Sequence, residues 1–279
     1  TPATPTAEKP QKEAVKAGPE APKYGGVFVY RTASDLTGWD EAYVQSRALS
    51  SSLYGAVNSL LVSGDWAKGP AGTNETDWYY GMLGQFGLLK GHLAESFELI
   101  KPGTIIFHVR QGVHWALNPK SAASQLVNGR EFTADDVVFS LTRHALKSPL
   151  TTMYQRFTAI GKPPTITKLD KYTVEVKVDP DMLGYGLTML GNFTLMWPHE
   201  VIEKYGDMKD WRNSVGTGPF MVTEYVAGSA MTYVRNPNFF MTDPVGPGKG
   251  NQLPYLDGFR TLIIPDPSTS QAAFRTGKI

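Results

Sequence analysis

The chain of 279 residues contains no cysteine. Disulfides, cysteine metal sites and a thiol nucleophile are therefore excluded, although this absence fits any cellular compartment. An excess of one charge is also lacking, because 27 Lys and Arg residues are balanced by 26 Asp and Glu residues. The net charge of +1 gives no reason to expect nucleic acid or an anionic membrane surface as a partner.

Long apolar runs are missing as well. The uncharged run Met182–Pro198 has 17 residues and contains glycine, asparagine and threonine, whereas a membrane-spanning helix needs about 20 mostly apolar residues. We expect this run to be buried inside a folded domain. No basic segment followed by an apolar one opens the chain, so no signal peptide is recognised.

Sequence motifs of the common enzyme classes are also absent. There is no G-x-S-x-G elbow, P-loop, H-E-x-x-H helix or EF-hand loop. Gly216-Thr217-Gly218 begins like a dinucleotide fingerprint, but a strand is expected next instead of the helix that would bind the pyrophosphate. The five histidines are scattered, and only His108 and His114 are expected on neighbouring strands. We predict no catalytic residue, no metal site and no cofactor.

The first segment, Thr1–Pro22, is rich in proline and alanine, and Val15 is its largest apolar residue. Such a segment buries too little surface to offset the entropy lost on ordering. We expect a disordered spacer, which is compatible with a stalk that holds a domain away from an envelope surface.

From Lys23 onward, strand and helix patterns are interspersed, which predicts an α/β or α+β fold. Residues 63–91 and 118–129 are expected to be loop insertions, the first with a short embedded element. The alternation and periodicity of apolar residues predict strands at 27–30, 104–110, 172–178, 193–197, 220–225, 231–235 and 261–264, and helices at 42–62, 133–147, 181–190, 198–205 and 268–276.

An acidic pair follows Thr133 at the start of one expected helix. Asp135 and Asp136 could be read as catalytic carboxylates. Threonine is a good N-cap and acidic side chains stabilise the positive end of a helix, so capping is the simpler explanation.

Aromatic side chains are frequent in or beside the expected loops. Trp and Tyr combine apolar area with a polar tip, and loops on a rigid scaffold often carry binding sites. Each of these side chains could instead cover an edge of the core. They are Trp39, Tyr43, Trp66, Trp78, Tyr79, Tyr80 and Trp115.

Four stretches and the end of the chain share the order and spacing of one protein family. They read KYGGVFVYR at 23–31, HLAESFEL with TIIFHVRQGVHW at 92–115, NGREFTADDVVFSLTR at 128–143, VGTGPFMVTEYVAGSAMTYVRNPNFF at 215–240, and LPYLDGFRTLIIPDPSTSQAAFRTGKI at 253–279. In these stretches the chain resembles the extracytoplasmic solute-binding proteins of peptide- and nickel-type ABC transporters, bacterial family 5.

The resemblance implies an α/β fold of the type II periplasmic-binding-protein kind, with two lobes and an extra subdomain in the first lobe. Ligand would bind between the lobes, which close about a hinge. Family chains are considerably longer, so this one resembles an N-terminal fragment. We expect a spacer at 1–22, an incomplete lobe I with its inserted subdomain at 23–264, and the start of the crossover to lobe II at 265–279.

The resemblance also implies a function without catalysis. The protein would capture a small solute outside the membrane and deliver it to an ABC permease, with a peptide expected first and a sugar, a nickel complex or haem as alternatives. It would be a periplasmic or extracytoplasmic monomer. Because the chain starts at Thr1 and not Met, we expect that something upstream was removed or is not part of this sequence. Thr1–Pro22 fits the spacer of a lipoprotein whose acylated cysteine would lie there.

Position in this fold suggests a set of ligand-binding residues. Several follow the first strand, and ligands of α/β proteins commonly bind beyond the carboxyl ends of strands. Thr217 lies in a G-T-G-P turn that backbone geometry alone could explain. The candidates are Ser34, Asp35, Trp39, Tyr43, Ser51, Tyr154, Asn192 and Thr217.

Two other classes of function remain open from the residues themselves. An envelope hydrolase would need a nucleophile and a base, or two carboxylates, that converge in one pocket. A surface interaction protein would use the aromatic insertion at 63–90.

Overall fold

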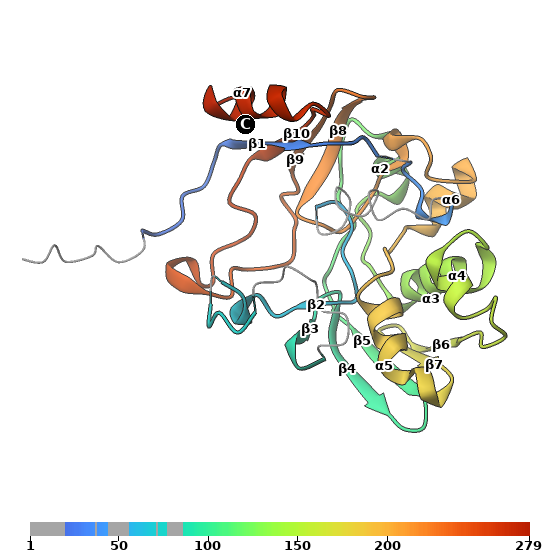
Figure 1. Ribbon diagram of the computed structural model, residues 1–279. Coiled ribbons are helices and arrows are strands. Elements are labelled where there is room, and N and C mark those ends of the chain that lie inside the picture. The colour runs from blue at the N-terminus through green and yellow to red at the C-terminus, as the bar shows by residue number, and fades with distance from the viewer. Residues whose placement is uncertain (1–19, 37, 44–55, 71, 77–85) are drawn as a thin grey trace, which may run out of the picture.

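The computed structural model describes residues 20–36, 38–43, 56–70, 72–76 and 86–279. Two four-stranded sheets form the body of this part of the chain. They lie at opposite ends of the view in Figure 1, and most helices gather along one side. Strands and helices are interspersed along the chain, so the α/β expectation is confirmed.

The first sheet has the strand order β1-β10-β9-β8. Its outer strand β1 runs parallel to β10, while the other neighbours are antiparallel. The parallel pair joins two segments far apart in sequence, and α7 (Pro267–Arg275) runs over this sheet in Figure 1. The strands are β1 (Val27–Thr32), β8 (Phe220–Val226), β9 (Ala230–Arg235) and β10 (Gly258–Ile263).

The second sheet is antiparallel throughout, with the order β4-β5-β7-β6. Its strand β5 buries Ile105 and Phe107 completely, which places the core against this sheet. A short pair, β2 with β3, lies between the two sheets in Figure 1. The strands are β2 (Val62–Gly64), β3 (Leu89–Gly91), β4 (Ala94–Ile100), β5 (Thr104–Val109), β6 (Thr165–Asp170) and β7 (Thr173–Lys177).

The helices are short, and two of them continue into π-helical turns. In the described ranges no helix is long and apolar enough to cross a membrane. The α-helices are α2 (Ala122–Val127), α3 (Ala134–Thr142), α4 (Thr152–Arg156), α5 (Leu183–Gly186) and α6 (His199–Tyr205), and the π-turns are Arg143–Lys147 after α3 and Leu187–Gly191 after α5.

Asp136, the second residue of the acidic pair at the start of α3, has the capping role that was expected. The Asp136 carboxylate accepts a hydrogen bond from the backbone N–H of Thr133 at 2.9 Å. It is fully buried and also accepts two hydrogen bonds from the Arg130 guanidinium, at 2.8 and 2.6 Å. Arg130 in turn binds Glu200 in the first turn of α6. One guanidinium therefore joins the starts of two helices.

The helix expected at 42–62 is wrong over 56–62, whereas Ala42 and Tyr43 at its start belong to a 3-10 turn, Glu41–Tyr43. Residues 56–61 form no helix, and β2 begins at Val62. The backbone groups of this segment bind neighbours across the fold: Val57 O accepts from Gly218 N at 2.8 Å, and Leu61 O accepts from Ala94 N at 3.0 Å. A segment buried among such neighbours shows apolar residues that mimic a helical period.

The strand expected at 193–197 is also wrong. The segment is buried, but side chains satisfy its backbone in place of a neighbouring strand. Ser140 Oγ accepts from Trp197 N at 2.9 Å, and Asn58 Nδ2 donates to Met196 O at 3.0 Å. The loop expected at 118–129 contains α2, whose helix starts after the cap Ser121.

Replacing Asp136 by Asn removes a buried charge and leaves the facing Arg130 without it. Breaking a buried ion pair from one side typically costs about 3–5 kcal/mol. Because Arg130 is partly exposed and keeps Glu200 as a partner, we expect the free energy of unfolding in urea to fall by about 2–4 kcal/mol. The matched control is Asp135→Asn, whose exposed carboxylate pairs with Lys168 at 2.8 Å. The control should lose less than about 1 kcal/mol. Equal losses of stability in Asp136→Asn and Asp135→Asn would contradict the structural role assigned to Asp136.

Candidate functional site

The chain that leaves β1 crosses to the β8–β9 hairpin, and Asp35 fixes it there. The Asp35 carboxylate accepts hydrogen bonds from Tyr225 Oη at 2.8 Å and from the backbone N–H of Gly228 at 2.6 Å. Gly228 has a φ of +68°, which suits glycine in a tight hairpin turn. Burial, followed by the hydrogen bond to Asp35, raises the pKa of Tyr225 to about 12. Tyr225 therefore stays protonated and acts as the donor.

Trp39 packs on the same tyrosine. Its ring meets Tyr225 edge-on, with 5.1 Å between the ring centroids and 72° between the planes. Trp39 is 5% exposed, and its indole N–H has no hydrogen-bond partner in the described part of the chain. Asp35 and Trp39 are thus brought together through Tyr225, a residue that the sequence analysis did not single out.

Asp40 attaches the other end of this segment to the helical side of the molecule. Its fully buried carboxylate accepts hydrogen bonds from both terminal nitrogens of Arg143, at 2.9 and 2.6 Å, and from Met208 N at 2.8 Å. Burial raises the pKa of Asp40, but Arg143 and the backbone donors outweigh burial and hold this pKa below its usual value. The Asp40 carboxylate is therefore charged, and its contacts give it a structural role.

Two of the candidates present side chains to solvent. Tyr43 is 47% exposed, and Lys209 Nζ lies 3.7 Å from the centre of its ring. Such a cation above an aromatic face stabilises the ring position. Ser34 is exposed, and its carbonyl accepts a hydrogen bond from Thr32 Oγ1 at 3.1 Å. Ser51 lies outside the described residues.

Asn192 and Thr217 lie along the extended segment that replaces the expected helix. Asn192 Nδ2 donates to Val62 O at 2.8 Å. Thr217 is 1% exposed, and its hydroxyl has no hydrogen-bond partner in the described residues. A Cβ on Gly216 would lie 1.9 Å from Val57 O. Close backbone approach therefore explains this glycine, as the geometric interpretation of the G-T-G-P turn expected.

Tyr154 is separate from the others. It lies on α4, is partly buried, and donates its backbone N–H to the cap Thr151. In the ranges described, no hydrogen bond or ring contact joins it to another candidate. The structure thus groups Asp35, Trp39 and Tyr43, places Asn192 and Thr217 along 56–62, and leaves Tyr154 apart.

The aromatic side chains expected in or beside loops fall into three groups. Trp115 is completely buried in the core, and Trp39 nearly so. Trp66 is 62% exposed and Tyr43 is half exposed. Trp78, Tyr79 and Tyr80 lie outside the described residues. The alternative that such side chains cover the core is therefore correct for Trp115 and Trp39.

Histidine and carboxylate side chains form no group of three that could hold a metal ion, as far as the described residues extend. The most unusual histidine is His144, which follows Arg143 in the π-turn. It is completely buried, and Trp197 Nε1 donates to its Nε2 at 3.2 Å. Burial, and then the charge of Arg143, lowers the pKa of His144 to about 3, although Asp40 acts in the other direction. The ring is neutral at pH 7.

Comparison with protein families gives a match over most of the chain. A family model described as bacterial extracellular solute-binding proteins, family 5 Middle, matches residues 89–279. A probable ABC transporter-binding protein of Deinococcus radiodurans is 27% identical over 202 residues, which are 67% of this chain and 32% of that protein. The dipeptide-binding protein of Escherichia coli is 29% identical over 199 residues, which are 64% of this chain and 33% of that protein.

Solved structures share the fold. The periplasmic binding protein DppA of Helicobacter pylori, in complex with the peptide STSA, superposes with a TM-score of 0.68 at 21% identity, covering 92% of this chain and 46% of that one. The type II periplasmic-binding-protein fold is thereby confirmed, with about one lobe present. The chain spans about a third of the length of the curated relatives it matches.

The neutral, buried His144 predicts a loss of stability in acid. Its folded-state pKa lies below the value of about 6.5 in an unfolded chain, so only the unfolded state gains a proton as the pH falls below 6.5. The contribution of the neutral His144 ring to the free energy of unfolding is fully present above pH 6.5. Below pH 6.5 this free energy declines by about 1.4 kcal/mol per pH unit.

When the pH is lowered from 7 to 5, the free energy of unfolding measured in urea should fall by about 2 kcal/mol less in His144→Gln than in the wild type. If His144→Gln and the wild type lost stability equally, the buried neutral state of His144 would be wrong.

Proposed function

The chain belongs to the bacterial extracellular solute-binding proteins of family 5, and we propose that the intact protein captures a peptide outside the membrane and delivers it to an ABC permease. The family match over residues 89–279 carries the proposal. The relatives reported above are described as binding proteins, and none as a hydrolase. We further propose that the protein is extracytoplasmic and monomeric, and that 1–22 is the spacer of a lipid anchor.

A peptide is the proposed solute because peptide binding recurs in the names of the relatives. The Escherichia coli relative is named for dipeptides, and the Helicobacter pylori structure contains a tetrapeptide. Residues 23–264 are proposed to form lobe I and residues 265–279 to lead toward a second lobe. The ligand would then lie against the edge of lobe I where β1 and β10 end.

Within lobe I, the proposed ligand-binding residues fall into groups according to the contacts that each side chain already makes. Asp35 and Trp39 are occupied in fixing the chain after β1, so we assign them a positioning role. Tyr43 and Ser34 keep exposed surface and are the proposed direct contacts. The remaining members stay in the proposed ligand-binding set without an assigned position at this edge: Ser51, Tyr154, Asn192 and Thr217.

Calorimetric titration of the intact protein tests the proposed function. The peptides Met-Leu and Ser-Thr-Ser-Ala are compared with maltose, haem and a nickel–histidine complex. We expect saturable binding of at least one peptide and no turnover of it. Saturation by haem or by the nickel complex alone would reject the peptide while keeping a solute-binding role. If no probe bound, both the peptide as the solute and the solute-binding role would be rejected.

Truncation of Tyr43 tests the proposed edge. Aromatic side chains dominate many binding sites, and loss of one commonly costs more than 1 kcal/mol. We therefore expect Tyr43→Ala to weaken peptide binding by about tenfold or more in the same titration. Tyr24→Ala is the control, because Tyr24 is similarly exposed (51%) and lies before the opposite end of β1. Equal affinities of Tyr43→Ala and the wild type would remove Tyr43 from the site.

A further inference from the structure

The ammonium of Lys209 is fixed over the ring of Tyr43, which is the proposed direct contact with the solute. Lys209 Nζ lies 3.7 Å from the centre of that ring. The backbones of the two residues are fixed as well, because Met208 N donates to the Asp40 carboxylate at 2.8 Å and Tyr43 N donates to Asp40 O at 3.1 Å. One buried aspartate therefore holds the two segments that carry Lys209 and Tyr43 side by side.

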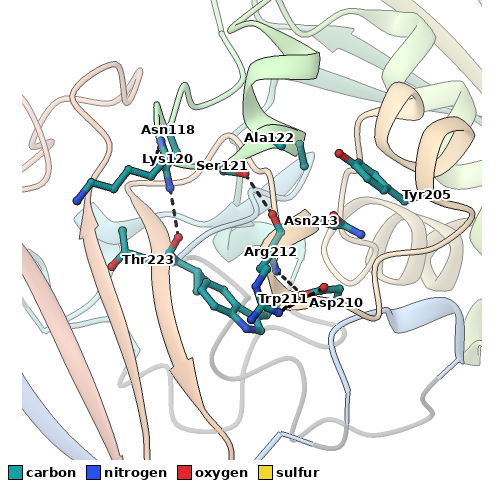
Figure 2. Close-up of a pocket in the computed structure, with 12 residues that line it drawn as sticks. Asn118, Lys120, Ser121, Ala122, Tyr205, Asp210, Trp211, Arg212, Asn213 and Thr223 are labelled. Carbon is teal, nitrogen blue, oxygen red and sulfur yellow. Dashed lines mark hydrogen bonds and ion pairs between the residues drawn. The ribbon is translucent and has the colours of Figure 1, made fainter.

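Neighbouring residues also fix the position of Lys209. One carboxylate oxygen of Asp207 accepts from the backbone N–H of Lys209 at 3.0 Å, and the other lies 2.9 Å from Nζ. Beyond Lys209 the chain enters the 3-10 turn Trp211–Asn213. Figure 2 shows how Ser121 Oγ donates to Arg212 O, at 3.1 Å, and ties this turn to the start of α2. The ammonium therefore has a defined position before a ligand arrives, which lowers the entropic cost of binding.

Lys209 is more accessible to a ligand than the carboxylates around it. Its side chain is 56% exposed, whereas that of its partner Asp207 is 28% exposed. Asp40 is completely buried, and the side chain of Glu41 is less exposed than that of Asp207. The hydrogen bond to Asp207 raises the pKa of Lys209, so its ammonium stays charged at neutral pH. The surface beside Tyr43 therefore offers a positive charge to a ligand.

A second donor lies beside this ammonium. The hydroxyl of Tyr43 has no hydrogen-bond partner among the residues that the structure describes, and the side chain is half exposed. Because the ammonium lies over the same ring, the two donors are close enough to bind the two oxygens of one carboxylate. An ammonium has three donors, so such a carboxylate would not have to displace Asp207.

We propose that Lys209 binds the C-terminal carboxylate of the peptide and so determines which end of the peptide lies at Tyr43. The proposal rests on the function proposed above, since it concerns the same peptide and the same edge of lobe I. A carboxylate at this position gains an ion pair and a hydrogen bond from the hydroxyl. The ammonium at the other end of a peptide would meet a like charge there.

Titration of the intact protein with Met-Leu and Ser-Thr-Ser-Ala, each with a free and an amidated C-terminus, tests this proposal. Neither peptide has an acidic side chain, so amidation removes its only negative charge. Because an exposed ion pair contributes modestly, we expect the wild type to bind the free peptide about threefold to fivefold more tightly than its amide. In Lys209→Met, which keeps the aliphatic stem, the ratio of the two affinities should fall by about threefold or more.

Two further variants separate the charge of Lys209 from a general effect of losing a lysine. Lys209→Arg keeps a cation over Tyr43 and should retain the preference for the free peptide. Lys177→Met removes a lysine of similar exposure (57%), which pairs with Glu175 at 2.8 Å on β7 in the second sheet. This control should bind both forms of the peptide as the wild type does.

The outcomes distinguish this proposal from the proposed function. If a peptide binds but its amide binds equally well, or if Lys209→Met keeps the preference of the wild type, the role of Lys209 is overturned while peptide binding stands. An equal loss of preference in Lys177→Met would also overturn it. If neither peptide binds in either form, the proposed peptide function is rejected, and the role of Lys209 is rejected with it.

Discussion

The buried ion pair between Asp40 and Arg143 is the contact on which the proposed binding edge depends. It joins the chain after β1 to the π-turn after α3, across 103 residues of sequence. A carboxylate without exposure has no water to replace a lost partner, so removing one side of such a pair typically costs about 3–5 kcal/mol. Asp35 fixes the start of the same segment on the β8–β9 hairpin. Tyr43 lies three residues beyond Asp40 at the surface, and its backbone N–H donates to Asp40 O at 3.1 Å.

The two sheets are connected by a segment that belongs to neither. The carbonyls of residues 56–61 accept backbone hydrogen bonds from the G-T-G-P turn and the start of β8 on one side and from residues 92–94 before and at the start of β4 on the other. Asn58 adds a side-chain bond to Met196. Because nearly every backbone group in such a buried segment must find a partner, the segment fixes the spacing between the first sheet and the second. Asn192 and Thr217 are placed by this packing.

Local signals predicted the elements whose stability is local. The cap at Thr133, the β8–β9 hairpin and β1 follow from residue type and alternation, and the structure confirms them. The segments at 56–62 and 193–197 could not be predicted this way, because distant side chains satisfy their backbones. For the site, proximity to the end of β1 indicated Asp35 and Trp39, but not Tyr225 or Arg143. Those partners lie far away in sequence, and only folding brings them together.

The most direct test of this account is a double-mutant cycle on the buried pair, with Asp40→Asn, Arg143→Met and both together, followed by urea unfolding. Residues that act only through each other show a coupling energy of up to about 3 kcal/mol. We expect the free energy of unfolding to fall less in the double variant than the sum of the two single losses, by about 2 kcal/mol or more. Additive losses, within about 0.5 kcal/mol, would show that Arg143 does not hold Asp40 and that something else fixes the chain after β1.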